Sequence, residues 1–586
     1  MIAKISKRKS MGVHYTPPRL AQFVAERLIE HARPTPGSPI RILDPACGDG
    51  ALLQALRNEL AHVWYGHAEV YGVEADGGTA EQARQRLAGW KDTEVRILHA
   101  DFLALCAEEG GQQQLWEPKE PNPLFYRAFD LVVANPPYVR TQVLGAQTAR
   151  QLGERFGLKG RVDLYHAFWV AMTEALREGG VIGIVTSNRF LSTLAGASVR
   201  RFLARNYLIS EIIDLGDTKL FEAAVLPAIF VGRRSASDAA PKPARGGNFV
   251  RLYSCPETGG NVEIQQHPKE TVYSLLRHGK PGRYRVAEGC FELARGPLAV
   301  DPDPTKVWEL TTPEEARWLD MVRAASTANF GSLARIRVGV KTTADDVFIR
   351  SDWETLPARC RPEESLLRPL LSHEHARRWL CDTEFKGLRI LYPHIVENGV
   401  RIAIDLDSYP RSKAYLESHR ERLERRTYVR DAGRGWYEIW VPQDPSGWEG
   451  PKIVFPDISA EPRFYLDTTG RIVDGDSYWI TLRPGVPTDV LFVLLALANS
   501  RVMSRYHDLS FNNRLYSSRR RFITQYVSRY PVPDLQSRPC RELAGLVQAF
   551  LTRRDPAAGE NGRTLFEAKV NQLVGEAFGL GSEADA

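Results

Sequence analysis

The segment Asn135-Pro136-Pro137-Tyr138 combines residue types that can act on an amino group. Proline cannot donate to a sheet ladder, so two prolines at a strand end must leave the sheet. The following proline holds Asn135 extended, so its side-chain oxygen and the Pro136 carbonyl can converge on one point. Two such acceptors suit both hydrogens of a planar conjugated amine, whose nitrogen then becomes more nucleophilic. Tyr138 supplies a ring for stacking on a base removed from a duplex; a strand exit without chemistry is the alternative.

A glycine-rich turn, DPACGDG, follows the apolar run IRIL. Glycines at a strand-to-helix turn allow tight backbone geometry and the close approach of a ligand. The turn is not a P-loop, because no GKS or GKT follows it. An ordinary turn is the alternative interpretation. The residues expected to contact a ligand here are Asp44, Pro45, Ala46, Cys47, Gly48 and Gly50.

Acidic residues also end the next two apolar runs, Glu74 after VYGV and Asp101 after VRILHA, with Phe102 following. A carboxylate at a strand end can accept hydrogen bonds from ribose hydroxyls, and a carboxylate beside an aromatic ring can hold an adenine by its amine and its ring face. Each acid alone is more simply a surface residue. Because open α/β sheets bind ligands at the carboxyl ends of their strands, acids at three successive strand ends favour a ligand site.

The elements that must position these residues alternate along the first part of the chain. Helical patterns such as 19–32 and 164–179 separate the apolar runs. This alternation predicts an α/β domain with a mostly parallel, seven-stranded sheet and helices on both faces. The apolar runs are 40–44, 70–74, 95–101, 129–137, 180–188, 210–217 and 228–234.

The second half of the chain is less regular. The stretch SASDAAPKPARGGN (235–248) breaks the alternation, so we place the end of the first domain at residue 240. We expect a connecting region at 241–330, a mixed α+β domain at 331–540 and a helical tail at 541–586. Single helices are predicted at 411–426 and 489–507.

A basic stretch with interleaved aromatic residues lies near the end of this second domain. Such a mixture suits contacts to phosphates and bases of DNA, although a solvated charged face is the alternative. The expected DNA-binding residues are Arg514, Arg519, Arg520 and Arg521.

Composition excludes several classes of protein. The chain has 586 residues, of which 43% are hydrophobic and 25% charged, a profile typical of soluble proteins with two or three domains. No apolar run reaches the roughly 18 residues needed to cross a bilayer, and the first residues lack the apolar stretch of a signal peptide. Seven scattered cysteines without a CxxC pair argue against zinc and disulfides. We expect a cytoplasmic protein with no metal, and the net charge of +6 only permits nucleic acid.

In this order, DPACGDG, Glu74, Asp101 and NPPY resemble the motifs of S-adenosylmethionine-dependent amino-methyltransferases. The chain is similar to their gamma class, the TaqI-like DNA adenine-N6 methyltransferases of restriction-modification systems. The resemblance implies a Rossmann-like catalytic domain followed by a target-recognition domain. It also implies S-adenosyl-L-methionine as the cofactor and transfer to N6 of a flipped-out adenine in double-stranded DNA.

Further segments carry the same resemblance. GVHYTPPRLAQFV is similar to an additional cofactor motif, which implies that Thr16 lies near the methionine carboxylate at a helix start. DLYHAF resembles the segment that lines the cofactor pocket, and Phe221 occupies the place of an aromatic residue that contacts the flipped base. Asn135 and Pro137 are also implied cofactor contacts. Segments similar to TaqI-like specificity domains are 336–349, 366–371, 452–467 and 519–535.

Two other functions remain open. NPPY also serves methyltransferases that act on RNA or on protein side chains, and a DNA-recognition subunit can keep a decayed methyltransferase fold. No endonuclease activity is predicted, because too few residues precede the first predicted strand for a nuclease domain. We expect a monomer that binds double-stranded DNA, and we leave open whether a separate cognate restriction endonuclease accompanies it.

Overall fold

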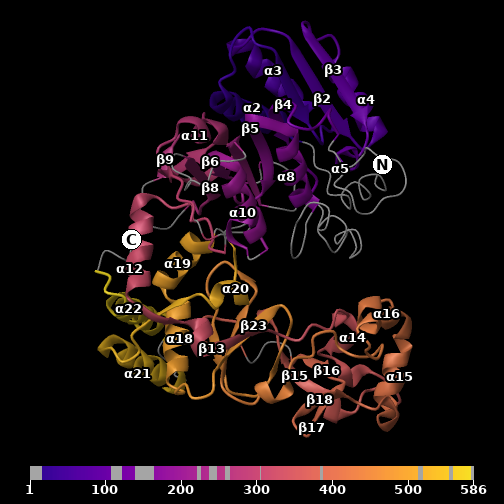
Figure 1. Cartoon of the computed structure of the whole chain (residues 1–586). Coiled ribbons are helices and arrows are strands. Elements are labelled where there is room, and N and C mark those ends of the chain that lie inside the picture. Colours follow the sequence, from indigo (N-terminus) through magenta and orange to yellow (C-terminus); the bar gives the residue numbers. More distant parts are fainter. Residues whose placement is uncertain are drawn as a thin grey trace. The chain divides into compact units, whose positions relative to one another are not determined.

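The computed structural model divides the chain into two compact units (Figure 1). The first unit comprises Met1–Ala316 with Leu509–Ser518, and the second comprises Arg317–Asp508 with Arg519–Ala586. The structure describes residues 16–106, 122–138, 164–193, 195–218, 220, 226–236, 247–257, 264–301, 303, 305–382, 387–511, 519–553 and 559–581.

An 11-stranded sheet forms the centre of the first unit, in the order β3-β2-β1-β4-β5-β7-β6-β8-β11-β10-β9. Strands β1 to β5 run parallel, and β7 lies antiparallel between β5 and β6. The predicted α/β class with a mostly parallel sheet is therefore confirmed. The first seven strands are β1 (Ile40–Asp44), β2 (Ala68–Glu74), β3 (Thr93–His99), β4 (Phe129–Ala134), β5 (Leu176–Ser187), β6 (Tyr207–Asp214) and β7 (Pro227–Arg234).

Four further strands extend this sheet beyond the seven that the sequence predicts. Strand β8 pairs parallel with β6, and it carries a buried apolar run that includes Phe249, Val250 and Leu252. The segment predicted as a connecting region thus continues the sheet, and the first unit extends to Ala316 rather than to residue 240. The additional strands are β8 (Asn248–Ser254), β9 (Ile264–Gln266), β10 (Gly282–Val286) and β11 (Gly289–Pro297).

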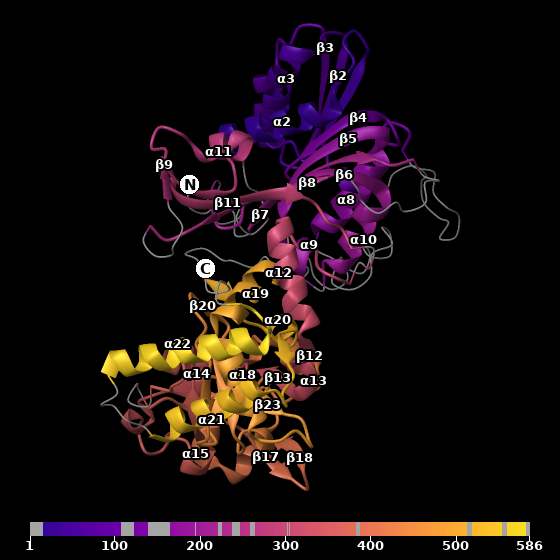
Figure 2. The ribbon, with the colours of Figure 1, turned by 90° about the vertical axis from the view of Figure 1, so that its left-hand side faces the viewer.

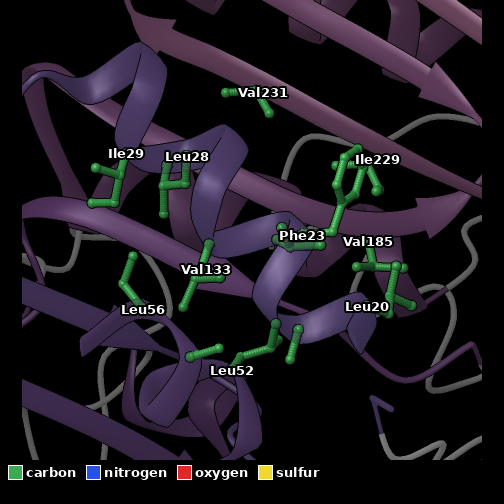
Figure 3. Close-up of a cluster of buried hydrophobic side chains, with 14 of the residues drawn as sticks. Leu20, Phe23, Leu28, Ile29, Leu52, Leu56, Val133, Val185, Ile229 and Val231 are labelled. Atoms are coloured by element: carbon green, nitrogen blue, oxygen red, sulfur yellow. The ribbon is translucent and has the colours of Figure 1, made fainter. Parts of the chain in front are cut away.

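Helices cover both faces of this sheet (Figure 2). On one face, Leu20, Phe23 and Leu28 of α2 pack with Leu56 of α3 against apolar strand residues such as Val133 (Figure 3). Their spacing of three to five residues places them on one side of the helix. On the other face, α8 and α10 pack against the opposite strand side chains. The helices of the unit are α2 (Pro18–Ala32), α3 (Ala51–Val63), α4 (Gly77–Leu87), α5 (Phe102–Leu105), α8 (Leu164–Ala175), α9 (Arg189–Ser192), α10 (Ala197–Asn206) and α11 (Val272–His278).

The second unit contains small sheets with helices at its C-terminal end. One sheet has the order β13-β23-β19-β21 and another the order β14-β16-β15-β22, while β17 and β18 form a hairpin. The strands are β12 (Ser326–Asn329), β13 (Ala334–Val338), β14 (Ile349–Arg350), β15 (Leu367–Leu371), β16 (Arg389–Leu391), β17 (His394–Glu397), β18 (Val400–Ala403), β19 (Lys452–Pro456), β20 (Ile458–Ser459), β21 (Tyr465–Asp467), β22 (Ile472–Val473), β23 (Ser477–Leu482), β24 (Arg520–Arg521) and β25 (Pro531–Pro533).

Two helices predicted in this unit are each divided. The segment 411–426 forms α15 and α16, which meet at His419. The segment 489–507 forms α18 and α19, because the hydroxyl of Ser500 accepts a hydrogen bond from the Met503 amide at 3.1 Å and caps the second helix. The helices are α12 (Pro313–Ala324), α13 (Phe330–Leu333), α14 (Asp345–Phe348), α15 (Pro410–Ser418), α16 (Arg420–Glu424), α17 (Thr427–Asp431), α18 (Val490–Asn499), α19 (Arg501–Phe511), α20 (Thr524–Val527), α21 (Arg538–Arg553) and α22 (Gly559–Ala577).

Within the described residues, none of the helices combines the length and the apolar character needed to cross a membrane.

Candidate active site

The first unit has a topological switch point between β1 and β4. These strands are parallel neighbours, with Leu43 opposite Val132, and the chain continues from them to opposite halves of the sheet. Open α/β sheets bind ligands at such a point, beyond the carboxyl ends of the strands. DPACGDG follows β1 and NPPY follows β4, so the sheet brings the two motifs to the same edge.

The DPACGDG turn has the tight backbone conformation that its glycines predict. Gly48 and Gly50 have φ angles of 53° and 84°, in the left-handed region that glycine adopts without strain. Gly50 also stands at the start of α3. The amide of Cys47 donates to the Val73 carbonyl at 2.9 Å, which ties the turn to the end of β2.

Glu74 fastens the same turn through its carboxylate. The Gly48 amide donates to Oε2 of Glu74 at 3.0 Å, and the Asp76 amide donates to Oε1 at 2.8 Å. These bonds orient the Glu74 carboxylate, and Glu74 lines a cavity beside the turn.

Asp44 is fully buried beneath the turn. Its Oδ1 accepts from the Ala46 amide at 3.1 Å, while its Oδ2 has no hydrogen-bond partner among the described residues. Burial, with a smaller contribution from the negative charge of Glu74, raises the pKa of the Asp44 carboxyl to about 8. With this raised pKa the Asp44 carboxyl is mostly protonated at neutral pH and carries little negative charge beneath the turn.

Asp101 and Phe102 lie where β3 leads into α5. Oδ1 of Asp101 accepts from the amides of Leu103 and Ala104 at 2.9 and 3.2 Å, so this side chain caps the short helix. Phe102 is buried and stacks on Phe168 of α8, with ring centroids 6.0 Å apart. Both predicted residues line the cavity.

The Asn135 side chain lies between two hydroxyl groups. Its Nδ2 donates to Oγ1 of Thr16 at 3.0 Å, and the Tyr138 hydroxyl donates to its Oδ1 at 2.7 Å. Burial raises the pKa of the Tyr138 phenol above its ordinary value, so the hydroxyl stays protonated at neutral pH. Oδ1 of Asn135, which we expect to bind the substrate amine, thus accepts a hydrogen bond from the neutral Tyr138 hydroxyl.

A cavity of about 240 Å³ joins these motifs. Ten of the predicted cofactor-binding residues line it, whereas Asp44 and Gly50 lie in the turn but not on its wall. The sequence did not single out Leu164 and Phe168, although both lie in the DLYHAF segment that was matched as a whole. The predicted residues on the wall are Thr16, Pro45, Ala46, Cys47, Gly48, Glu74, Asp101, Phe102, Asn135 and Pro137.

The remaining predicted residues lie elsewhere. Phe221 and Arg514 fall outside the described residues. In the second unit, the Arg520 guanidinium forms two hydrogen bonds with the Asp508 carboxylate, at 2.6 and 2.7 Å. Arg521 binds Asp457 in the same way, with two distances of 2.9 Å, and Arg519 is exposed.

An open α/β sheet whose switch point holds DPACGDG, two strand-end acids and NPPY defines the class of S-adenosylmethionine-dependent methyltransferases. Residues 68–221 match the family model of the Eco57I restriction-modification methylase, and residues 401–532 match that of the TaqI-like C-terminal specificity domain.

Similarity to individual methyltransferases extends along the whole chain. It is 40% identical over 577 residues to the type II methyltransferase M.BanIII of Aneurinibacillus aneurinilyticus, covering 98% of each protein. It is 25% identical over 558 residues to the type II methyltransferase M.PaeR7I of Pseudomonas aeruginosa, covering 92% of this chain and 88% of that protein. The chain belongs to the TaqI-like methyltransferases of restriction-modification systems, and it is a DNA methyltransferase that uses S-adenosyl-L-methionine.

Proposed function

We propose that the protein transfers a methyl group from S-adenosylmethionine to N6 of an adenine flipped out of double-stranded DNA. The observation that carries this proposal is the position of Asn135, whose carboxamide lies on the wall of the cavity with its oxygen turned toward a hydrogen-bond donor. An exocyclic amine presents the same kind of donor as the Tyr138 hydroxyl.

The residues of the turn and the strand-end acids suit the cofactor, which supplies the activated methyl group when bound. We assign Glu74 to its ribose hydroxyls, and Asp101 with Phe102 to its adenine ring.

In the proposed reaction, Oδ1 of Asn135 and the Pro136 carbonyl accept the two hydrogens of the adenine amine. Held in this way, the nitrogen lone pair is less delocalised into the ring and is available for attack on the methyl group. The new N–C bond would form as the sulfonium–methyl bond of the cofactor breaks, which would leave a neutral thioether. The methylated nitrogen would then release one proton to water and recover its neutral form. Tyr138 does not act as a base, because its raised pKa keeps the phenol protonated, so we assign its ring to stacking on the extruded base.

The second unit is proposed to hold the DNA, and contacts to the duplex offset the cost of flipping a base, a few kcal/mol. Of the three described arginines of the basic stretch, Arg519 is the best candidate for a phosphate contact, because Arg520 and Arg521 already pair with carboxylates. We further propose that the protein acts as a cytoplasmic monomer and protects host DNA from a separate cognate endonuclease.

Mass spectrometry of DNA treated with the purified protein and S-adenosylmethionine tests this proposal. We expect N6-methyladenine in the hydrolysed DNA. Asn135→Ala removes one of the two acceptors and should slow the formation of this product on the order of 100-fold or more. N4-methylcytosine as the product would refute the choice of base. Tight binding of S-adenosylmethionine without methylation of any DNA would favour an RNA or protein substrate, and failure to bind S-adenosylmethionine would favour a recognition subunit.

A further inference from the structure

Thr16 has a second relationship to the site, besides its place on the cavity wall. The residue is 9% exposed, and its hydroxyl oxygen accepts the Nδ2 hydrogen of Asn135 at 3.0 Å. Thr16 lies two residues before α2, whose Leu20, Phe23 and Val24 are fully buried in the core. The packing of α2 therefore fixes the position of this hydroxyl relative to the end of β4.

A carboxamide has one end that accepts hydrogen bonds and one end that only donates them. A hydroxyl group can both donate and accept a hydrogen bond. Thr16 and Tyr138 can therefore bond the Asn135 amide in either of its two orientations, with the oxygen or with the NH2 group toward Tyr138. An amine in the place of the Tyr138 hydroxyl offers donors to Asn135. The amide oxygen must then face the amine, and the NH2 end must find its acceptor on the side of Thr16.

We propose that Thr16 is a positioning residue for methyl transfer, because its hydroxyl accepts the Asn135 NH2 group and holds the amide oxygen toward the substrate amine. This inference rests on the proposed function. Without the hydroxyl, the productive orientation leaves a buried N–H group unsatisfied, while the flipped orientation still finds an acceptor in the Tyr138 hydroxyl. The cost of such an unsatisfied group corresponds to a rate loss on the order of 10- to 100-fold.

A residue that only contacts the cofactor has a different signature. Loss of such a contact raises the KM for S-adenosylmethionine and leaves the rate at saturation unchanged. A residue that only stabilises the fold lowers the melting temperature and leaves the rate below that temperature unchanged. The proposed role of Thr16 affects the rate at saturating cofactor.

Single-turnover methylation with saturating S-adenosylmethionine and target DNA separates these roles. Thr16→Val and Thr16→Ala both remove the hydroxyl and should lower the rate on the order of 10- to 100-fold, while Thr16→Ser keeps the hydroxyl and should retain most of the rate. Thr173→Val is the matched control, because the buried Thr173 hydroxyl donates to the Trp169 carbonyl at 2.7 Å. This control should lose stability without losing rate.

A double-mutant cycle with Tyr138→Phe tests the orientation of the amide. Removing the phenol hydroxyl takes away the acceptor that favours the flipped amide, so the double variant with Thr16→Val should lose less than the product of the two single losses. Strictly multiplicative losses, or a Thr16→Val rate within twofold of wild type at saturation, would overturn the inference. The wild-type product tests the proposed function separately, because the rate ratios hold for whichever amine is methylated.

Discussion

The hydroxyl of Tyr138 lies 2.7 Å from Oδ1 of Asn135 and donates a hydrogen bond to it. In the proposed reaction the substrate amine binds the same acceptor, so in the protein without substrate the oxygen proposed for catalysis already accepts a hydrogen bond. The proposed reaction therefore requires Tyr138 to release this bond before the amine is held, and it assigns the freed ring to the base.

Replacing Tyr138 by Phe should separate these two roles. The variant keeps the ring for stacking and removes the competing donor, so we expect DNA with a flipped target base to bind as tightly as in the wild type or more tightly. Tyr138→Ala should weaken it, because stacking of a base on an aromatic ring is worth about 1–3 kcal/mol. Fluorescence of 2-aminopurine at the target position measures both effects. Equal weakening in the two variants would show that the hydroxyl, rather than the ring, holds the base.

Glu74→Ala should raise the KM for S-adenosylmethionine more than it lowers kcat. A ribose contact is made equally in the ground state and in the transition state, and the Gly48 and Asp76 amides also lose their acceptor. Glu69→Ala in the same strand is the matched control, since Glu69 pairs with Arg41 instead. Steady-state kinetics at varied cofactor concentration would count against the assignment if kcat fell and KM stayed constant.

Asp44 should make stability depend on pH. Its pKa is raised from 3.8 to about 8 in the folded protein, so its contribution is fully present below the lower value and is lost as the pH rises through the higher one. The melting temperature of wild type should therefore fall more than that of Asp44→Asn between about pH 5 and about pH 9. Parallel pH profiles of the two proteins would contradict the buried, protonated state of this carboxyl.

The basic stretch should show a division between neighbouring arginines. Arg519→Ala should reduce the slope of log affinity for DNA against log salt by about 0.9, as expected for one lost phosphate contact. Arg520→Ala should lower the melting temperature instead, because it removes two charge-assisted hydrogen bonds from the partly buried Asp508 carboxylate. Fluorescence titrations at several salt concentrations and thermal melts measure the two effects. Identical salt slopes for Arg519→Ala and wild type would assign the stretch to a solvated face.

The sequence predicted the placement of the site better than its internal contacts. Glycines, strand-end acids and two prolines act locally, so their spacing alone located the edge of the sheet that carries the cavity. The bond from Asn135 to Thr16 joins residues 119 positions apart, and no local pattern records it. Burial of Asp44 under its own turn also depends on packing that the spacing of motifs does not reveal.

The boundaries of the first domain and of one helix were predicted less well, because they also depend on contacts that local sequence does not show. The Pro- and Gly-rich stretch before β8 looks like a linker, because local composition does not show that the next strand pairs with β6. Conversely, the apolar pattern on both sides of Ser500 predicts one continuous helix. In the structure the chain turns at Ser500, whose hydroxyl caps a second helix, and the apolar pattern does not indicate this turn.

The pairing of β8 with β6 has a practical consequence for dissecting the molecule. A chain cut at residue 240 would leave Ile212, Ile213 and Asp214 on an open edge, where their backbone groups invite pairing with another molecule. The same cut would also remove Tyr253, whose hydroxyl donates to the fully buried Asp214 carboxylate at 2.6 Å. A fragment that keeps both neighbours of β6, and the pairing of β8 with β11, must extend at least to Pro297.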